Sequence, residues 1–224
     1  MSLGFIILLI VIFGYISNWL NWRYLNYKIT HYLYYIGAFV HESSHALLCI
    51  LTGAKITGFK VFVSQPHVTH GKSKLFFIGN LLISSAPIFG GLLFLFLVNH
   101  LVLGDFFSFN SINITDWQSV LSGPLGLITQ MNPIHWQSWV MLFLLINVGA
   151  MLGPSFQDIK NIWLTLIVLF FIQSSVLENI GLIALNLILV NIMIQAVVVL
   201  IIKVTSYIRR KVSGTGGIRT LEAR

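Results

Sequence analysis

Apolar segments long enough to cross a lipid bilayer recur along this chain and limit what it can fold into. A helix needs about 20 mostly apolar residues to span the hydrocarbon core. Six segments approach or exceed that length: residues 3–20, 33–51, 75–103, 139–153, 162–177 and 182–202. Only 8% of the residues are charged, against about 25% in soluble domains. We therefore expect an all-α, multi-pass membrane protein with about six transmembrane helices, in direct contact with the lipid bilayer.

The basic residues are distributed unequally between the two sides of these predicted spans. With the N-terminus inside, the inner loops and the C-terminal tail hold eleven of the 13 Lys and Arg residues, and the outer loops hold only Arg23 and Lys28. Such an excess marks the cytoplasmic side. We therefore expect a cell-membrane protein with both termini in the cytoplasm. The net charge of +7 is too scattered along the chain to indicate a nucleic-acid partner.

Two polar connections between the spans are predicted to carry local structure. Residues 56–63, within the inner connection 53–74, have side chains that favour a strand or a hairpin. The longest polar connection, 104–137, is expected on the outer face with a short interfacial helix. Residues 1–206 thus form one transmembrane domain, and residues 207–224 are predicted to be a basic, disordered cytoplasmic tail.

Five consecutive polar residues, from His41 to His45, interrupt the second apolar segment. Positions i and i+4 of a helix lie on one face, so both imidazoles can bind one zinc ion while Glu42 lies beside it as a general base. An ionisable group at mid-bilayer costs about 2.5–3.5 kcal/mol on insertion scales. A divalent cation offsets that cost. The alternative is a helix whose few polar residues are satisfied by neighbours, and the mid-helix position favours the metal site.

Two histidines leave a catalytic zinc site one protein ligand short. Of the six acidic residues, Asp158 is the only one besides Glu42 that is predicted to reach the inner half of the membrane. It follows a break at Gly153-Pro154, where the chain is free to turn inward. We therefore expect Asp158 to be the third ligand. As alternatives, it caps a helix or pairs with Lys160.

Other polar or helix-breaking residues have simpler expected roles. His67 and His70 lack an acidic or cysteine partner, and we expect them in a loop without a metal. The third apolar segment contains Pro87 and is expected to tilt or kink there. Amides in the last apolar segment either face a polar groove or bond to neighbouring helices. They are Asn186, Asn191 and Gln195.

The motif His41-Glu42-Ser43-Ser44-His45-Ala46-Leu47, followed by Leu51-Thr52-Gly53-Ala54-Lys55, resembles the site-2 protease family of intramembrane zinc metalloproteases. The segment from Asn147 to Asp158 is similar to a divergent form of that family's second motif. Ser85-Ala86-Pro87 is loosely similar to a small-Gly-Pro element on the intervening helix. Asp158 is followed by Ile159 where the family has glycine, and only Pro154 stands for its prolines.

The resemblance implies a transmembrane metalloprotease domain whose core is residues 32–160. It implies that His41, His45 and Asp158 bind Zn²⁺ and that Glu42 is the catalytic base for a zinc-activated water. It also implies that Asn147 steadies the oxyanion or the substrate backbone, with a hydrogen bond between helices as an equal alternative. The implied substrates are transmembrane or signal-peptide-like segments of other proteins. An unwound substrate could add a strand to the edge of residues 56–63.

Three other functions are open on sequence alone. A catalytically inactive relative would bind membrane proteins as a chaperone or regulator, although an intact Glu42 argues against this. A metal transporter is expected to spread ionisable residues over several helices. A membrane-anchored metalloprotease acting outside the bilayer, with Glu178 as a ligand, conflicts with the apolar flanks of the motif.

Overall fold

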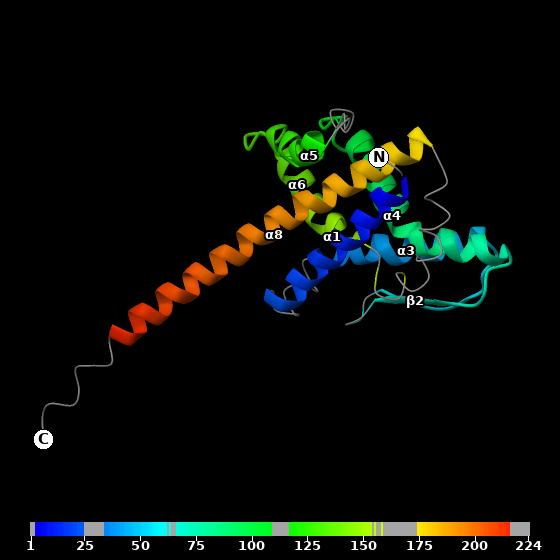
Figure 1. Ribbon diagram of the computed structural model, residues 1–224, viewed down its shortest axis with the longest axis horizontal. Coiled ribbons are helices and arrows are strands. Elements are labelled where there is room, and N and C mark those ends of the chain that lie inside the picture. Colours follow the sequence, from blue (N-terminus) through cyan, green and yellow to red (C-terminus); the bar gives the residue numbers. More distant parts are fainter. Residues whose placement is uncertain are drawn as a thin grey trace, which may run out of the picture.

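The computed structural model describes residues 3–24, 34–61, 63, 66–108, 117–153, 155, 158 and 174–215. These residues form a mostly helical fold with one small antiparallel sheet, as predicted (Figure 1). The elements in chain order are α1 (Leu3–Tyr24), α3 (Tyr35–Leu51), β1 (Ile56–Lys60), β2 (His67–His70), α4 (Phe76–Leu101), α5 (Trp117–Thr129), α6 (Trp136–Met151) and α8 (Ser175–Thr215).

Three of the described helices are long and apolar enough to cross a membrane. These candidate spans are Leu3–Asn21, Ile78–Leu101 and Ser175–Arg209. Helix α6 is apolar but has only 16 residues, and α3 has 17. Most of the predicted span 162–177 lies outside the described residues. Three spans are therefore supported, and the total of six remains a prediction.

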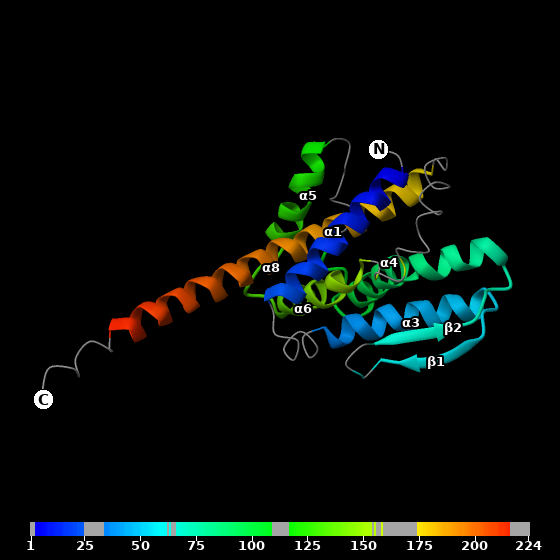
Figure 2. The same ribbon diagram turned by 60° about the horizontal axis from the view of Figure 1, so that its bottom comes forward.

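Helix α6 occupies the centre of the packing, where it contacts α1, α3, α4 and α8. Helix α3 packs against α4 and α6, α6 also packs against α8, and α1 lies along α8 (Figure 1). The main apolar core is built mostly from side chains of α1, α6 and α8, among them Ile6, Leu145, Leu185 and Ile188. This packing places α3 between α6 on one side and the hairpin of β1 and β2 on another (Figure 2).

Glycines allow the backbone of α3 to approach its neighbours closely. A Cβ atom on Gly37 of α3 would overlap the backbone carbonyl oxygen of Asn147 in α6. A Cβ atom on Gly90 of α4 would overlap the hydroxyl oxygen of Ser44 in α3. Small residues at helix crossings are the usual means by which membrane helices pack at short range. Both α4 and α6 therefore lie against the polar segment of α3.

The amides of α8 bond mainly to a neighbouring helix. The Asn191 Nδ2 group donates to Ser17 Oγ of α1 at 2.9 Å. The Gln195 Nε2 group donates to Ser17 Oγ and to Asn21 Oδ1, each at 3.0 Å. Asn186 instead donates to the carbonyl of its own helix, at Leu182. For Asn191 and Gln195 the structure thus shows the predicted hydrogen bonds between helices, which join α1 to α8.

The connection 53–74 forms the predicted hairpin, with one correction. Strand β1 pairs antiparallel with β2, and Lys60 lies opposite His67. The expectation that His67 and His70 lie in a loop is wrong, because they are the first and last residues of β2. Its central residues, Val68 and Thr69, are β-branched types that favour strands, and β1 supplies the partner backbone. The short helix expected in the connection 104–137 is confirmed as α5.

Helix α8 corrects the prediction for the C-terminal tail. The tail was expected to be disordered from Tyr207 onward, but α8 continues through Thr215. Once a helix has formed, each further residue adds a hydrogen bond without a new nucleation cost. Lys and Arg are also good helix formers, so the basic residues at 209–211 extend the helix instead of ending it. Residues 216–224 lie outside the described residues.

Candidate metal centre

Helix α3 turns its polar side inward and its apolar side outward. His41, Glu42, Ser44 and His45 are buried, whereas Ile50 is 67% exposed. A helix in water would show the reverse arrangement. The i, i+4 spacing places both imidazoles on the buried face, as predicted.

Backbone carbonyls orient both imidazole rings. His41 Nδ1 lies 2.7 Å from the carbonyl oxygen of Met151, and His45 Nδ1 lies 2.8 Å from that of Ile83. A carbonyl oxygen can only accept, so in each ring Nδ1 carries the proton and donates it. In the neutral form of each ring, Nε2 then keeps its lone pair. This is the arrangement by which proteins prepare a histidine to bind a metal through Nε2.

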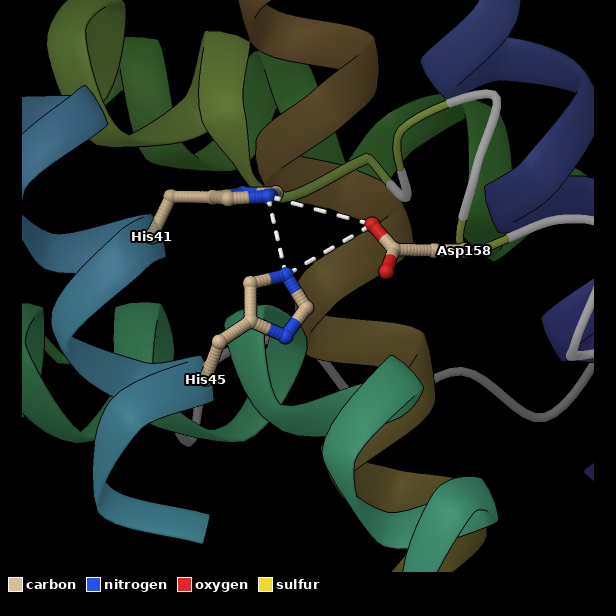
Figure 3. Close-up of side chains that lie close together, drawn as sticks. All are labelled: His41, His45 and Asp158. Atoms are coloured by element: carbon tan, nitrogen blue, oxygen red, sulfur yellow. Dashed lines mark hydrogen bonds and ion pairs between the residues drawn. The ribbon is translucent and has the colours of Figure 1, made fainter. Parts of the chain in front are cut away.

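Asp158 completes a group of three ligand atoms, shown in Figure 3. The Nε2 atoms of His41 and His45 are 3.2 Å apart. The Oδ2 atom of Asp158 lies 3.9 Å from the first and 3.6 Å from the second (Figure 3). Bonds of about 2.0–2.1 Å to a tetrahedral zinc ion place its ligands about 3.3–3.4 Å apart. The separations of 3.2 and 3.6 Å are close to that value and the 3.9 Å separation is longer, so the group could hold a metal ion if Asp158 moved slightly towards His41.

No other group of three His, Cys, Asp or Glu side chains close enough to share a metal ion appears in the described part of the chain. The His41, His45 and Asp158 set is buried throughout, with ligand atoms within 4.8 Å of one another. Glu178 lies in the first turn of α8 and is not part of this set. Within the described residues, the alternative that used Glu178 as a ligand therefore has no structural support.

Ser155 holds the Asp158 carboxylate in place. The Ser155 backbone N–H and hydroxyl both donate to Asp158 Oδ2, at 2.9 and 2.6 Å. In return, the Asp158 N–H donates to Ser155 Oγ at 3.2 Å. These reciprocal bonds form a capping box. The Asp158 carboxylate thus accepts from the Ser155 backbone N–H, as a capping side chain does, and also faces the histidines. Lys160, its other expected partner, lies outside the described residues. The Ser-x-x-Asp spacing was the sequence signal for Ser155, which was not among the predicted site residues.

Glu42 lies beside the metal group without belonging to it. It is buried, and the Val68 backbone N–H of β2 donates a hydrogen bond to its carboxyl. The His67 imidazole lies close enough to interact with it electrostatically. The hairpin packs against α3 (Figure 2), so two residues that the sequence assigned to a loop help to surround the predicted base.

Asn147 is fully buried in α6, but its side chain bonds within its own helix. Its Nδ2 group donates to the Phe143 carbonyl at 3.2 Å, and its Oδ1 atom has no hydrogen-bond partner among the described residues. The expected side-chain hydrogen bond between helices is therefore not seen there. Instead its backbone carbonyl contacts Gly37, one turn before His41. The oxyanion role stays a prediction.

Comparison with known proteins agrees with this site. Residues 5–105 match the sequence model of the Peptidase M50B-like family, a site-2 protease family. The matched region contains His41, Glu42 and His45 and ends before Asp158, so it confirms the resemblance at the first motif. No curated protein and no solved structure matches the chain. The family match and the three long apolar helices indicate a membrane protein related to intramembrane proteases.

We expect Ser155→Ala to weaken metal binding, because the Asp158 carboxylate loses a hydroxyl donor and is less well oriented. Loss of such a supporting partner typically lowers metal affinity about 10- to 100-fold. Competition with a chelator of known affinity measures the change. Ser155→Thr keeps the hydroxyl and should retain most of the affinity. Equal affinity of the alanine variant and the wild type would show that Ser155 does not position a ligand.

Proposed function

We propose that this protein is an intramembrane zinc metalloprotease that cleaves membrane-anchored segments of other proteins. One observation carries the proposal. His41, His45 and Asp158 converge on one buried point, and Glu42 lies on the same helix as the two histidines. The family match over residues 5–105 supports the interpretation of this arrangement as the active site of a protease.

The donor set fits a catalytic zinc ion. Two imidazoles and one carboxylate are typical of catalytic sites that keep a fourth position open for water or substrate. The opposed Nε2 lone pairs, 3.2 Å apart in a buried environment, repel each other unless a cation lies between them. When bound, zinc would act as a Lewis acid and lower the pKa of water towards neutrality.

Glu42 is proposed as the general base. Its carboxyl lies outside the ligand group and is held by the Val68 N–H, so it is available to accept a proton from water. It can then return that proton to the amine that leaves the cleaved peptide bond. Proton transfer by a positioned side chain contributes about 10²–10⁴-fold to rate.

The hairpin is the proposed substrate platform. Peptide bonds in a helical substrate are shielded, so a membrane-anchored segment must unwind locally before cleavage. The sheet consists of β1 and β2 alone within the described residues, so no described strand pairs with the outer edge of β1. An unwound segment could add there as a further strand. The proposed substrates are transmembrane or signal-peptide-like segments.

We also propose a multi-pass protein with both termini in the cytoplasm. The eleven basic residues assigned to the inner side, against two on the outer side, support this orientation. It places the hairpin and Asp158 towards the cytoplasmic half of the membrane.

The catalytic proposal predicts different outcomes for three acidic residues. Glu42→Gln should retain zinc and lose cleavage by at least about 100-fold, because it removes a base and leaves the ligands in place. Asp158→Asn should lose zinc and cleavage together. Glu178→Gln is the matched control and should change neither. The measurement combines zinc content with cleavage of single-span polyleucine peptides that carry a helix-destabilising Asn-Pro pair.

Each result decides a separate point. Undiminished cleavage by Glu42→Gln would exclude Glu42 as the base. Full zinc binding by Asp158→Asn would exclude the third ligand. A zinc-loaded wild type that cleaves none of the peptides would favour the alternative function, an inactive relative that binds membrane proteins as a chaperone or regulator.

The orientation predicts which side of the membrane reaches the hairpin connection. The native cysteine, Cys49, is buried, so introduced cysteines can be labelled selectively. Lys72→Cys should react with a membrane-impermeant maleimide only after the membrane is opened, whereas Trp136→Cys should react in intact cells. Labelling of Lys72→Cys in intact cells would contradict the orientation.

A further inference from the structure

The carbonyl oxygen that orients His45 belongs to the middle of a helix. Ile83 lies within α4 (Phe76–Leu101) and accepts from His45 Nδ1 at 2.8 Å. In a regular helix the carbonyl of residue 83 accepts instead from the N–H of residue 87. Residue 87 is proline, which has no N–H and whose ring pushes the carbonyl four residues earlier out of line. The Ile83 carbonyl is thereby left without its usual donor.

The carbonyl that orients His41 is also free of a helical partner. Met151 is the last residue of α6, and the last four carbonyls of any helix lack an intrahelical donor. Each imidazole therefore bonds to a backbone carbonyl that accepts no hydrogen bond within the helix to which the carbonyl belongs. For His41 the end of a helix frees the carbonyl, whereas for His45 a proline inside a continuous helix does so.

The packing of α3 on α4 explains why His45 meets this carbonyl. A Cβ atom on Gly90 would overlap the hydroxyl of Ser44, the residue before His45. Ile83 is only 2% exposed, and Pro87 is buried. A buried carbonyl without a partner is costly, so the nearest donor, the His45 ring, is held to it.

We propose that Pro87 is a positioning residue of the metal centre. By withholding an N–H from the Ile83 carbonyl, it reserves that carbonyl for His45 Nδ1–H. This fixes the tautomer in which His45 Nε2 faces His41 and Asp158. The inference rests on the proposed function only in taking Nε2 as a zinc ligand. It assigns a role in zinc binding to a residue that touches neither the metal nor the substrate.

The first test adds the missing N–H. In Pro87→Ala, the new N–H at position 87 competes with His45 for the Ile83 carbonyl. We expect helix content to be retained and zinc affinity, measured by chelator competition, to fall about tenfold, as when an outer-shell partner is lost. Pro124→Ala makes the same change in α5, which contributes none of the three ligands, and should leave zinc affinity unchanged. Wild-type affinity in Pro87→Ala would overturn the proposal.

A second variant separates the N–H from the proline ring. Lactic acid, the hydroxy-acid analogue of alanine, can be placed at position 87 by nonsense suppression. It has the alanine side chain but an ester oxygen in place of the N–H, so we expect it to bind zinc as tightly as the wild type. A loss equal to that of Pro87→Ala would show that the ring matters and the absent N–H does not, which overturns the proposal.

A third measurement does not depend on zinc. In the metal-free protein, ¹⁵N-histidine NMR should show His45 as the Nδ1–H tautomer in the wild type and a mixture of tautomers in Pro87→Ala. If the His45 tautomer changes on Pro87→Ala but the wild type binds no zinc, the proposed function is contradicted and the orienting role stays intact. A zinc-binding wild type whose tautomer does not respond to Pro87→Ala would contradict the inference and leave the proposed function intact.

Discussion

Two imidazoles and a carboxylate are buried together, and the rest of the structure depends on satisfying them. Each costs free energy when removed from water unless it is hydrogen-bonded, paired or bound to a metal. The required partners come from places where the regular hydrogen bonding of a helix is interrupted. The last carbonyl of α6 accepts from His41, the carbonyl ahead of Pro87 accepts from His45, and the turn after α6 supplies Ser155 to Asp158.

Helix breaks that weaken an isolated helix thus serve the site. Apolar helices satisfy all their backbone groups internally, so they offer few donors or acceptors to a neighbouring side chain. A proline or a helix end releases one such group at a defined position. Close packing at Gly37 and Gly90 brings those positions against α3. The same geometry leaves the Nε2 atoms free and directed towards one another.

Local patterns made part of this site predictable from sequence. The spacing of His41 and His45 is sufficient because both lie on one helix, and Asp158 followed by elimination because acidic residues are scarce. Contacts between distant segments had no such signal. The bond from Val68 to Glu42 depends on how the hairpin packs on α3, and β2 needed β1 as a partner before its residues could form a strand. Composition likewise led to an underestimate of the length of α8. The helix continues into its basic end because a long helix already precedes it.

The central claim is that His41, His45 and Asp158 bind one catalytic zinc ion. Elemental analysis of the purified wild-type protein, combined with X-ray absorption at the zinc edge, tests it most directly. The account predicts one zinc per chain, with two imidazole nitrogens at about 2.0–2.1 Å and carboxylate or water oxygens at about 2.0–2.2 Å. A protein that binds no stoichiometric zinc, or a zinc shell with a thiolate or without imidazole, would contradict it.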